Sequence, residues 1–579
     1  MKPNRGISFV GLRYRCLGQR SLASYADAGS DRNPTYEKLT KLKLVSILVN
    51  RLLEPKLMKE FDTLADLSRI QAQKIPDARA LIFKDQATTY KELDKESDRL
   101  ANALLARGIK AESRVAILAQ DSPQSYEILF ACAKIKAVVV PINWRLAAAE
   151  VSYILNDAEV ELLFVGAKFY DLIGSIASDL IKVKTIIALA ETRENWLNYS
   201  QWTEQYSDES PEITISPNDI AVQLYTSGTT GRPKGVQLGH YSFFAVAKEW
   251  TQQGQNWMNW QETDKSLLVV PFFHIGGLWW AIRGFVAGAE NILLPAFNPL
   301  EILEVMEKYR ITKAGMVPAM IQVVLSEPQC QETDFSSLKY VLYGGSPIAE
   351  SLLREAMQTF SCDFVQIYGM TETGNCAVCL PEEAHTSSNT DLLKSAGKPF
   401  PGVSVIAVDN QGKQLPPFKI GEIRIKSPAN MLGYWKLPEA TAKTLVDGWI
   451  HTGDAGYIDN EGYIYICDRI KDMICYAGEN VYPAEIENIL AAHPAIAEVG
   501  VIGVPDEDFG ESIKAIVVLK PGMKAKALEI INFVRGKLAD FKLPRSVEFV
   551  ESLPRTPSGK IQKGKLREPY WQGYERKVN

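Results

Sequence analysis

The sequence predicts a large α/β protein in which helices cover sheets of mainly parallel strands. The chain has 579 residues, too many to fold around one hydrophobic core, so more than one domain is expected. From about residue 63, segments with helical spacing alternate with short apolar runs, a rhythm typical of parallel sheets covered by helices. After about residue 395, glycine turns and short alternating strands replace this rhythm, which predicts a small β-rich lobe.

The first series of elements begins after residue 62. Helical spacing over residues 93–107, 126–136 and 148–156 alternates with strand-like runs over 114–119, 137–142 and 161–165. A further strand-like run over 220–224 leads into a glycine-rich segment. This order favours helix-covered strands at the start of the large domain.

A second series follows the glycine-rich segment, with strand-like runs over 267–271, 314–317, 340–343 and 364–367. The apolar stretch 267–282 is broken by Pro271 and His274 and closed by Arg283. It therefore falls short of the roughly 20 uninterrupted apolar residues that a membrane-spanning helix needs. We interpret it as a buried strand, a turn and a buried helix.

The C-terminal part changes character twice. Strands of the small β-lobe are expected over 403–408, 421–425 and 462–467, and a boundary near residues 469–472. Beyond it we expect a helix over 483–492, strands over 498–504 and 513–519, a helix over 527–538 and a basic segment over 542–577. The predicted organisation is an N-terminal extension (1–62), a large domain of sheets and β-lobe (63–470) and a small mobile α+β domain (471–579).

The N-terminal extension is basic and then helical in pattern. Five basic residues precede the first acidic residue, Asp27: Lys2, Arg5, Arg13, Arg15 and Arg20. This composition is typical of an organelle-targeting presequence, but a disordered basic tail or an upstream start-codon extension fits equally well. Leucines and lysines interleave over 36–62, so a helix there could lie on a membrane surface or pack on its own domain.

Composition narrows the classes of function. With 46% hydrophobic residues and a net charge of −5, nothing favours nucleic acid as the main partner. Eight cysteines without a secretory signal indicate reduced thiols in an intracellular compartment. We expect the cytoplasm, and the basic N-terminus leaves a mitochondrial location open. Cys376 and Cys379 form a CxxC pair without a second pair or nearby histidine, so buried thiols are preferred over zinc.

The segment over residues 225–235 predicts a phosphate-binding loop. Its sequence, YTSGTTGRPKG, combines hydroxyl groups, three glycines and Lys234 directly after a strand-like run. Glycines let backbone N–H groups approach a phosphate, while the hydroxyls and the lysine add donors and positive charge. It is not a Walker loop, because Pro233 stands where the second glycine of that motif belongs.

Other segments that could carry chemistry follow at long intervals. His274 lies in an apolar run, two glycines follow a strand at 344–345, and amide, phenol, hydroxyl and carboxylate groups follow the next strand at 366–372. Because ligands of open α/β sheets bind at the carboxyl ends of strands, these segments are expected to converge. Singly, each has an ordinary structural explanation, such as a turn glycine or a core histidine.

Taken together and in this order, the motifs resemble the acyl-adenylate-forming superfamily of acyl-CoA synthetases, firefly luciferase and peptide-synthetase adenylation domains. The resemblance covers about residues 65–570. DRIKDMI at 468–474 and GENVYPAEIE at 478–487 are most similar to bacterial-type fatty-acyl-CoA synthetases. The resemblance implies an AMP-binding N-terminal domain and a C-terminal domain that rotates about Lys471. Ala477 departs from the two glycines that fatty-acyl relatives often carry at 477–478.

The resemblance also implies a binding site for ATP, Mg²⁺ and coenzyme A. Thr229 and Glu372 would hold Mg²⁺, which prefers oxygen ligands. Asp454 would bind the ribose hydroxyls with support from Arg469, and Gly478 would approach the thiol substrate. The residues expected to hold ATP are Thr226, Ser227, Gly228, Thr229, Thr230, Gly231 and Lys234, then Gly344, Gly345, Ser346 and Pro347, and finally Gln366, Tyr368, Gly369 and Thr371.

The implied catalytic residues are Lys560, His274, Lys234 and Glu372. A carboxylate attacking a phosphate is repelled, so clustered positive charge and Mg²⁺ must neutralise the transition state. Lys560 would bridge the carboxylate and the α-phosphate while pyrophosphate leaves. A thiol would then attack the acyl-AMP, and AMP would depart. No nucleophilic side chain is needed, consistent with the lack of a GxSxG motif.

The acid and the thiol acceptor are less well defined. Amino-acid-activating relatives have an acidic residue near the His274 segment that binds the substrate's ammonium group. Residues 272–280 of this chain, FFHIGGLWW, contain no acidic residue. We therefore expect an apolar acid, first a medium- or long-chain fatty acid. Trp279 and Trp280 could shape its pocket or simply pack in the core. Because the chain ends soon after Lys560, coenzyme A is the expected acceptor.

Several alternatives stay open. The same chemistry could act on an aryl, succinylbenzoyl-like or sterol side-chain acid, or load a carrier protein. A nucleotide-binding regulator without catalysis is the alternative from another class, although the catalytic set is intact. Peripheral membrane association and a homodimer are compatible with the sequence, and neither is specified by it.

Overall fold

The computed structural model describes residues 61–193, 195–226, 232–253, 257–477, 479–506, 508–556 and 560–572. These residues belong to one compact unit, Glu54–Asn579. The predicted presequence and nearly all of the predicted helix over 36–62 lie outside the described residues, as do residues 227–231 and Gly478. In the part that is described, no helix has the length and apolar character needed to cross a membrane.

One large sheet has eight strands in the order β19-β9-β8-β4-β3-β5-β6-β7. Strands β8, β4, β3, β5, β6 and β7 pair in parallel, whereas β9 pairs antiparallel with both β8 and β19. The bounds are β3 Arg114–Leu118, β4 Val138–Pro141, β5 Leu162–Val165, β6 Thr185–Ala188, β7 Leu197–Asn198, β8 Ile220–Thr226, β9 Lys234–Gly239 and β19 Gly433–Tyr434. The predicted phosphate loop therefore connects two paired strands, β8 and β9.

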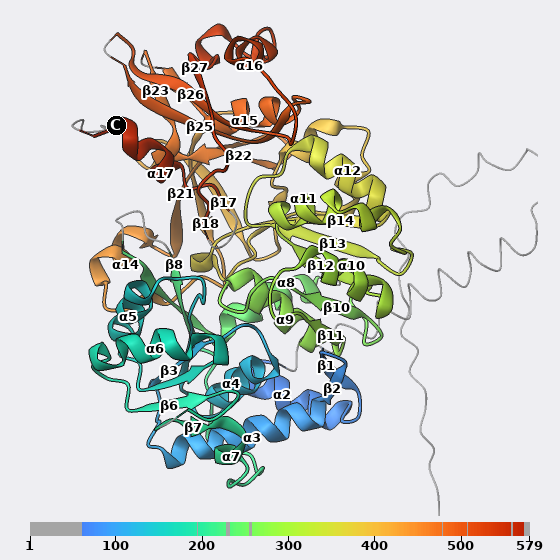
Figure 1. The fold of residues 1–579 in the computed structure, drawn as a ribbon, viewed down its shortest axis with the longest axis vertical. Helices are drawn as coiled ribbons and strands as arrows, with labels where there is room; N and C mark the ends of the chain where they lie inside the picture. Colours follow the sequence, from blue (N-terminus) through green and yellow to red (C-terminus); the bar gives the residue numbers. More distant parts are fainter. Residues whose placement is uncertain are drawn as a thin grey trace, which may run out of the picture. The chain divides into compact units, whose positions relative to one another are not determined.

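The helices associated with this sheet include α3, which begins with a capping box formed by Thr89 and Glu92. Proline at the first turn and a basic last turn mark α4. The bounds are α2 Leu64–Lys74, α3 Tyr90–Ala106, α4 Pro123–Lys134, α5 Ala148–Asp157, α6 Tyr170–Ile176, α7 Tyr199–Thr203 and α8 Ala245–Gln252. Figure 1 shows α5 and α6 beside β3 and β6.

The second large sheet has nine strands in the order β16-β15-β14-β13-β12-β10-β11-β1-β2. Its six central strands, from β14 to β1, pair in parallel. At the edges, β15 pairs antiparallel with β14, β16 with β15, and β2 with β1. The bounds are β1 Arg79–Phe83, β2 Gln86–Thr89, β10 Lys265–Leu268, β11 Glu290–Leu293, β12 Lys313–Met316, β13 Tyr340–Gly344, β14 Asp363–Tyr368, β15 Val378–Leu380 and β16 Lys398–Pro399.

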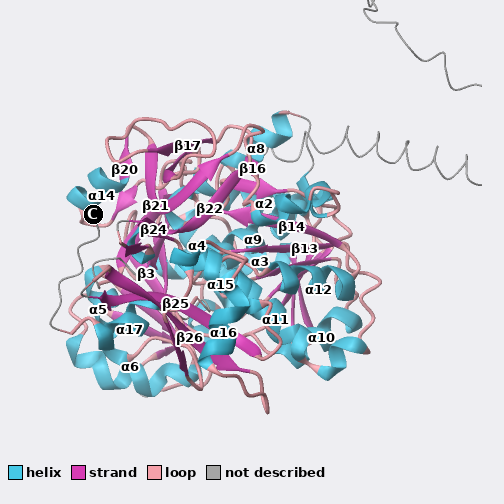
Figure 2. Cartoon of the chain, turned by 90° about the horizontal axis from the view of Figure 1, so that it is seen from above, coloured by secondary structure: helices cyan, strands magenta, loops and turns pink. Residues whose placement is uncertain are grey.

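Four helices alternate with these strands: α9 Ile275–Ala287, α10 Pro299–Lys308, α11 Pro318–Ser326 and α12 Glu350–Phe360. A short helix, α13 Glu382–His385, follows β15. Figures 1 and 2 both place α10, α11 and α12 beside the β12–β14 part of the sheet. Helix α9 ends at Gly288, whose φ of +73° lies in the left-handed region that favours glycine.

Two smaller sheets follow. The first has the order β17-β18-β21-β20 with β22 on β21, and the second β24-β23-β26-β25 with β27 on β26. The strands are β17 Ser404–Val408, β18 Gly421–Lys426, β20 Leu445–Val446, β21 Trp449–Ile458, β22 Ile464–Arg469, β23 Ile474–Tyr476, β24 Glu479–Val481, β25 Ile496–Asp506, β26 Gly510–Leu519 and β27 Ser546–Phe549. The helices are α14 Pro438–Thr444, α15 Pro483–Ala491, α16 Ala527–Val534 and α17 Lys563–Arg567.

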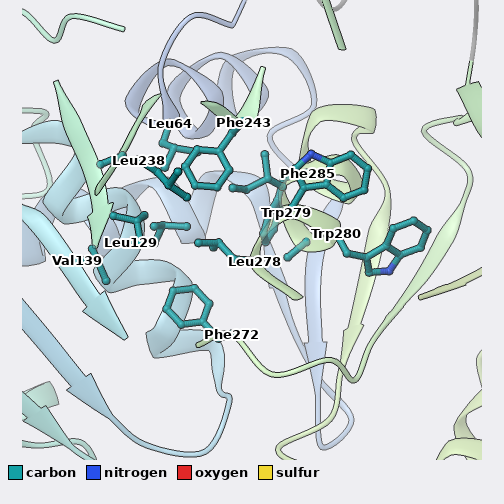
Figure 3. Close-up of a cluster of buried hydrophobic side chains, with 14 of the residues drawn as sticks. Leu64, Leu129, Val139, Leu238, Phe243, Phe272, Leu278, Trp279, Trp280 and Phe285 are labelled. Atoms are coloured by element: carbon teal, nitrogen blue, oxygen red, sulfur yellow. The ribbon is translucent and has the colours of Figure 1, made fainter. Parts of the chain in front are cut away.

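The main hydrophobic core joins the two large sheets. Leu129 of α4, Val139 of β4 and Leu238 of β9 share one cluster with Leu278 and Phe285 of α9 (Figure 3). The second small sheet has a core of its own, built from residues between Ile474 and Leu543. The apolar stretch 267–282 is thus a strand, a turn and a buried helix, as predicted.

The predicted α/β class is confirmed, and the strands and helices lie close to the expected ranges. The alternation of helical and strand-like segments in the sequence did not predict the antiparallel strands β9, β15 and β19. These strands are short or follow directly on a parallel strand. The predicted helix over 527–538 ends at Val534. The domain boundaries at residues 63 and 471 stay predictions.

Candidate active site

The carboxyl ends of β13 and β14 bring the two predicted strand-end segments together. The strands are parallel neighbours, with Gly344 opposite Ile367. A Cβ atom at Gly344 would lie 2.4 Å from the Ile367 carbonyl oxygen, so a side chain has no space there. Gly345 follows with a φ of +80°. The close approach of these backbones requires glycine, and it places residues 344–347 beside residues 366–369.

Asp454, Arg469 and Tyr368 form one hydrogen-bonded cluster. Asp454 on β21 lies opposite Arg469 on β22, and Arg469 Nε is 2.7 Å from Asp454 Oδ1. The Tyr368 hydroxyl, from the end of β14, donates to Asp454 Oδ2 at 2.6 Å. Burial raises the pKa of Asp454, and the positive charge of Arg469 opposes that rise. The cluster joins a large sheet to the β-lobe.

Glu372 and Lys234 both contact Tyr434, a residue that no sequence motif indicated. The Tyr434 hydroxyl donates to Glu372 Oε1 at 2.8 Å, and Lys234 Nζ lies 5.0 Å from the centre of its ring. Tyr434 belongs to β19, which pairs with β9, the strand that begins at Lys234. Tyr434 lies 62 residues after Glu372 and 200 residues after Lys234, so no local sequence pattern predicts these contacts.

Lys560 lies among these charged groups. Its pKa is lowered, first by loss of hydration and then by the positive charge of Arg469, while the carboxylates of Asp454 and Glu372 oppose the shift. The side chain still has solvent access, so protein surrounds it only in part. A lysine from the last part of the chain thus joins residues from two different sheets.

His274 stands at the start of α9, and Lys560 and Arg145 lie close enough to affect its charge. Burial is the main cause that lowers the pKa of His274 to about 3, and the two nearby cations add to it. Its Nε2 atom is buried and has no hydrogen-bond partner among the described residues. His274 is therefore a neutral imidazole at physiological pH, unable to act as a cation.

The neutrality of His274 leads to a pH prediction. We expect the acid limb of the pH–rate profile for acid-dependent pyrophosphate release to be the same in the wild type and in His274→Asn. The limb should instead reflect Asp454, which burial makes easier to protonate than an exposed aspartate. Initial rates between pH 5 and pH 9 measure it. A limb that moves when His274 is replaced would contradict the assignment.

The remaining predicted residues fall into three groups. Thr226 lies opposite Lys234 across β8 and β9, and Gln366 Oε1 accepts a hydrogen bond from the Tyr343 hydroxyl at 3.2 Å. Ser346 and Pro347 follow β13, and Gly369 and Thr371 follow β14. Outside the described residues lie Ser227, Gly228, Thr229, Thr230, Gly231 and Gly478, so their roles stay predictions.

The two tryptophans that follow the His274 turn have different surroundings. Trp280 donates to the Leu267 carbonyl at 3.1 Å and packs over Gly315 of β12, which makes it a core residue. Trp279 instead lies 5.7 Å, centre to centre, from Trp257. Cys376 and Cys379 are buried, and Cys379 Sγ accepts a hydrogen bond from Trp257 Nε1 at 3.2 Å. The CxxC pair is therefore part of the packing around this aromatic group.

Comparisons with known proteins match nearly the whole described chain. Residues 68–435 match the family described as AMP-binding enzyme, and residues 485–560 match the AMP-binding enzyme C-terminal domain. A fatty acid–[acyl-carrier-protein] ligase from Streptomyces coeruleorubidus is 46% identical, over 90% of this chain and 99% of that protein. A long-chain-fatty-acid–CoA ligase from Mycobacterium tuberculosis is 35% identical, over 84% of this chain and 94% of that protein.

Solved structures give the same result. The crystal structure of an anthranilate CoA ligase in complex with anthranoyl-AMP has a TM-score of 0.82 and 28% sequence identity. It covers 88% of this chain, and the match extends over 97% of that chain. The agreement therefore includes both the large sheets and the smaller C-terminal sheet.

Proposed function

Because the chain belongs to the acyl-adenylate-forming family of AMP-binding enzymes, we propose that it activates a fatty acid with ATP and transfers the acyl group to a phosphopantetheine thiol. The products are an acyl thioester, AMP and pyrophosphate, formed through acyl-AMP. Membership of this family identifies the chain as an adenylate-forming ligase. A medium- or long-chain acid and coenzyme A as the acceptor are the finer parts of the proposal.

The placement of Lys560 carries the proposal. This cation lies near Asp454, Arg469 and Glu372 and also affects His274. In the proposed reaction a carboxylate oxygen attacks the α-phosphorus of ATP, and the bond to pyrophosphate breaks. The step brings two negatively charged groups together, and as the bond to pyrophosphate breaks, negative charge builds up on the α-phosphate oxygens and on the leaving pyrophosphate. A positioned lysine stabilises that charge in the transition state. Lys560 bridges the two groups in this step.

The nucleotide is held by residues from several elements. Asp454 accepts hydrogen bonds from the ribose hydroxyls, since each of its oxygens has a lone pair beyond those used by Arg469 and Tyr368. The glycine-flanked ends of β13 and β14 receive the adenine and the α-phosphate. Lys234, near the end of the phosphate loop, assists the departing pyrophosphate.

Magnesium fits the oxygen donors of this site. The Tyr434 hydroxyl donates to Oε1 of the buried Glu372 carboxylate, so Oε2 is the oxygen available to a cation. Mg²⁺ is commonly held by one or two carboxylates together with substrate phosphates. Glu372, with Thr229, would hold it, and when bound it neutralises phosphate charge. Lys234, which contacts the Tyr434 ring, would add further positive charge for the departing pyrophosphate.

The second half-reaction needs a different approach to the same acyl group. A thiol gives up its proton, its sulfur attacks the acyl carbonyl and the bond to AMP breaks. We propose that residues from 471 onward rotate about Lys471, which removes Lys560 and brings the segment around Gly478 towards the thiol entrance. Ala477 has a φ of +51°, a conformation that costs an alanine energy and that glycine adopts freely.

A carrier protein is the second candidate acceptor. The relative from Streptomyces coeruleorubidus, named a fatty acid–[acyl-carrier-protein] ligase, is 46% identical to this chain, compared with 35% for the fatty-acid–CoA ligase. Coenzyme A and a carrier protein present the same phosphopantetheine thiol. They differ in what surrounds it, a nucleotide in one case and a protein surface in the other.

The deciding experiment uses the full chain with ATP, Mg²⁺ and a panel of fatty, aryl and sterol acids. Pyrophosphate and AMP are measured without thiol, with coenzyme A and with a phosphopantetheinylated carrier protein. We expect fatty acids to give the highest AMP turnover with coenzyme A. Stimulation by the carrier protein alone would favour the second candidate. If no acid supports AMP formation, a nucleotide-binding regulator becomes the better interpretation.

A further inference from the structure

The start of α9 offers hydrogen-bond donors next to open space. His274 precedes the helix, and no side chain caps it. The first N–H groups of any helix lack partners within the helix, and they give this end a partial positive charge. A Cβ atom added to Gly276 would have one neighbour within 4 Å, Asn375 Oδ1 at 3.9 Å. Gly277, in contrast, would place a Cβ 2.3 Å from the Val270 carbonyl oxygen.

The side chain of Asn375 borders this space and lacks a partner. Asn375 is only 9% exposed, and its Nδ2 is fully buried without a hydrogen-bond partner among the described residues. Buried polar groups in native proteins are nearly always paired with protein, water or ligand. The Asn375 atom that borders the space is Oδ1, an acceptor, whereas the first N–H groups of α9 are donors. A hydroxyl group in the space can donate to Oδ1 and accept from an N–H group of α9.

The backbone holds Asn375 in place near the reacting end of the site. Its N–H donates to the Met370 carbonyl at 3.0 Å, and its φ of +84° is one that asparagine tolerates better than most residues. A Cβ atom at Gly369 would lie 1.7 Å from the Asn375 carbonyl oxygen, so the two backbones pack closely. Asn375 also follows Glu372 by three residues. A substrate hydroxyl group that pairs with it would lie close to the acid's carboxyl group.

We propose that Asn375 and the first turn of α9 bind a neutral oxygen on the acid substrate, close to its carboxyl group. The substrate class is then a hydroxy-substituted aliphatic acid rather than a plain hydrocarbon chain, because a hydroxyl group can both donate to Asn375 Oδ1 and accept from the helix N–H groups. This inference rests on the proposed function and refines its acid. A site built to pair with a substrate oxygen rejects the analogue that lacks it, because the buried amide is then left unpaired.

The experiment compares acids of equal length with and without a hydroxyl group at carbon 2, 3 or 4. The kcat/KM of pyrophosphate release at saturating ATP is measured for each pair. We expect at least one hydroxylated acid to be preferred by about tenfold, equivalent to about 1.4 kcal/mol. In Asn375→Gly, which suits the positive φ, this preference should fall to near one, chiefly through the hydroxylated acid.

Two further variants sharpen the test. Gly276→Ala places a methyl group in the open space and should also reduce the preference, because it obstructs the oxygen. Ser361→Gly introduces a glycine at an exposed positive-φ position at the end of α12 and should keep the preference unchanged.

Equal use of both members of every pair by the wild type would overturn the proposal. So would an Asn375→Gly enzyme that loses both acids of each pair to the same extent, since that result indicates support of the common carboxyl group or of the fold. Complete lack of acid-dependent pyrophosphate release by the wild type would overturn the proposed function itself. Loss of the preference alone leaves that function standing.

Discussion

Replacing Lys560 by alanine is expected to slow acyl-adenylate formation by about 10²–10³-fold, the usual effect of removing one transition-state donor. Transfer of the acyl group from supplied acyl-AMP to the thiol should stay close to the wild-type rate. The reason is the position of Lys560, whose charge is set by Asp454, Glu372 and Arg469 at the proposed nucleotide site. In the proposed second step this lysine has moved away.

The two half-reactions are measured separately, by acid-dependent pyrophosphate release and by thioester formation from synthetic acyl-AMP. Lys560→Arg is the matched control, because it keeps the charge but not the ammonium geometry. The lowered pKa of Lys560 makes the wild-type adenylation rate fall at a lower pH than a fully hydrated lysine without neighbouring cations would allow. That basic limb should disappear in Lys560→Arg. Equal loss of both half-reactions in Lys560→Ala would refute the role of Lys560.

The sequence predicted best those elements whose signal is local. Strands β13 and β14 are apolar runs that end in glycine, amide and hydroxyl residues, so both their position and the meeting of their carboxyl ends could be foreseen. Strand β19 is only two residues long and pairs with β9 almost 200 residues earlier in the chain. A pairing of that kind depends on the tertiary fold and leaves no periodicity in the sequence.

The site divides in the same way. Asp454 and Arg469 stood out as a motif, and they lie opposite each other on adjacent strands. Tyr434 and Asn375 did not stand out in the sequence, because their roles depend on their three-dimensional surroundings. Tyr434 contacts a carboxylate and a lysine, and Asn375 has a buried Nδ2 without a hydrogen-bond partner among the described residues. Trp280 illustrates the converse: it follows the predicted catalytic residue His274 closely in sequence, yet it packs in the core against the sheet.

Helix α17 carries Lys563, which forms an ion pair between the two proposed domains. Lys563 Nζ lies 3.2 Å from Asp468 Oδ2 on β22 and 3.1 Å from Glu487 Oε1 on α15. All three side chains are largely buried, with 8–18% exposure. Asp468 precedes the proposed hinge at Lys471, whereas Lys563 and Glu487 follow it. The pair between Lys563 and Asp468 therefore crosses the hinge, and the pair with Glu487 does not.

We expect Lys563→Met to slow adenylation much more than thioester formation. Removing one partner from a buried charge cluster leaves the other charges uncompensated, at a cost of about 3–5 kcal/mol. Part of that cost falls on the arrangement in which Lys560 reaches the proposed nucleotide site, because Asp468 loses its ion-pair partner across the hinge and keeps the Ala484 N–H group as a donor there. Adenylation should fall by about a hundredfold, measured as acid-dependent pyrophosphate release, while transfer from supplied acyl-AMP falls less.

Single replacements of the two acids separate the contributions. Asp468→Asn removes only the charge across the hinge and should reproduce the selective loss of adenylation. Glu487→Gln weakens a contact within the C-terminal segment and should lower the melting temperature, with both half-reactions changed to a similar degree. If Asp468→Asn and Glu487→Gln gave the same pattern, the cluster would serve stability alone. A selective effect of Asp468→Asn would instead mean that an ion pair three residues from Lys560 holds the chain in the adenylating arrangement.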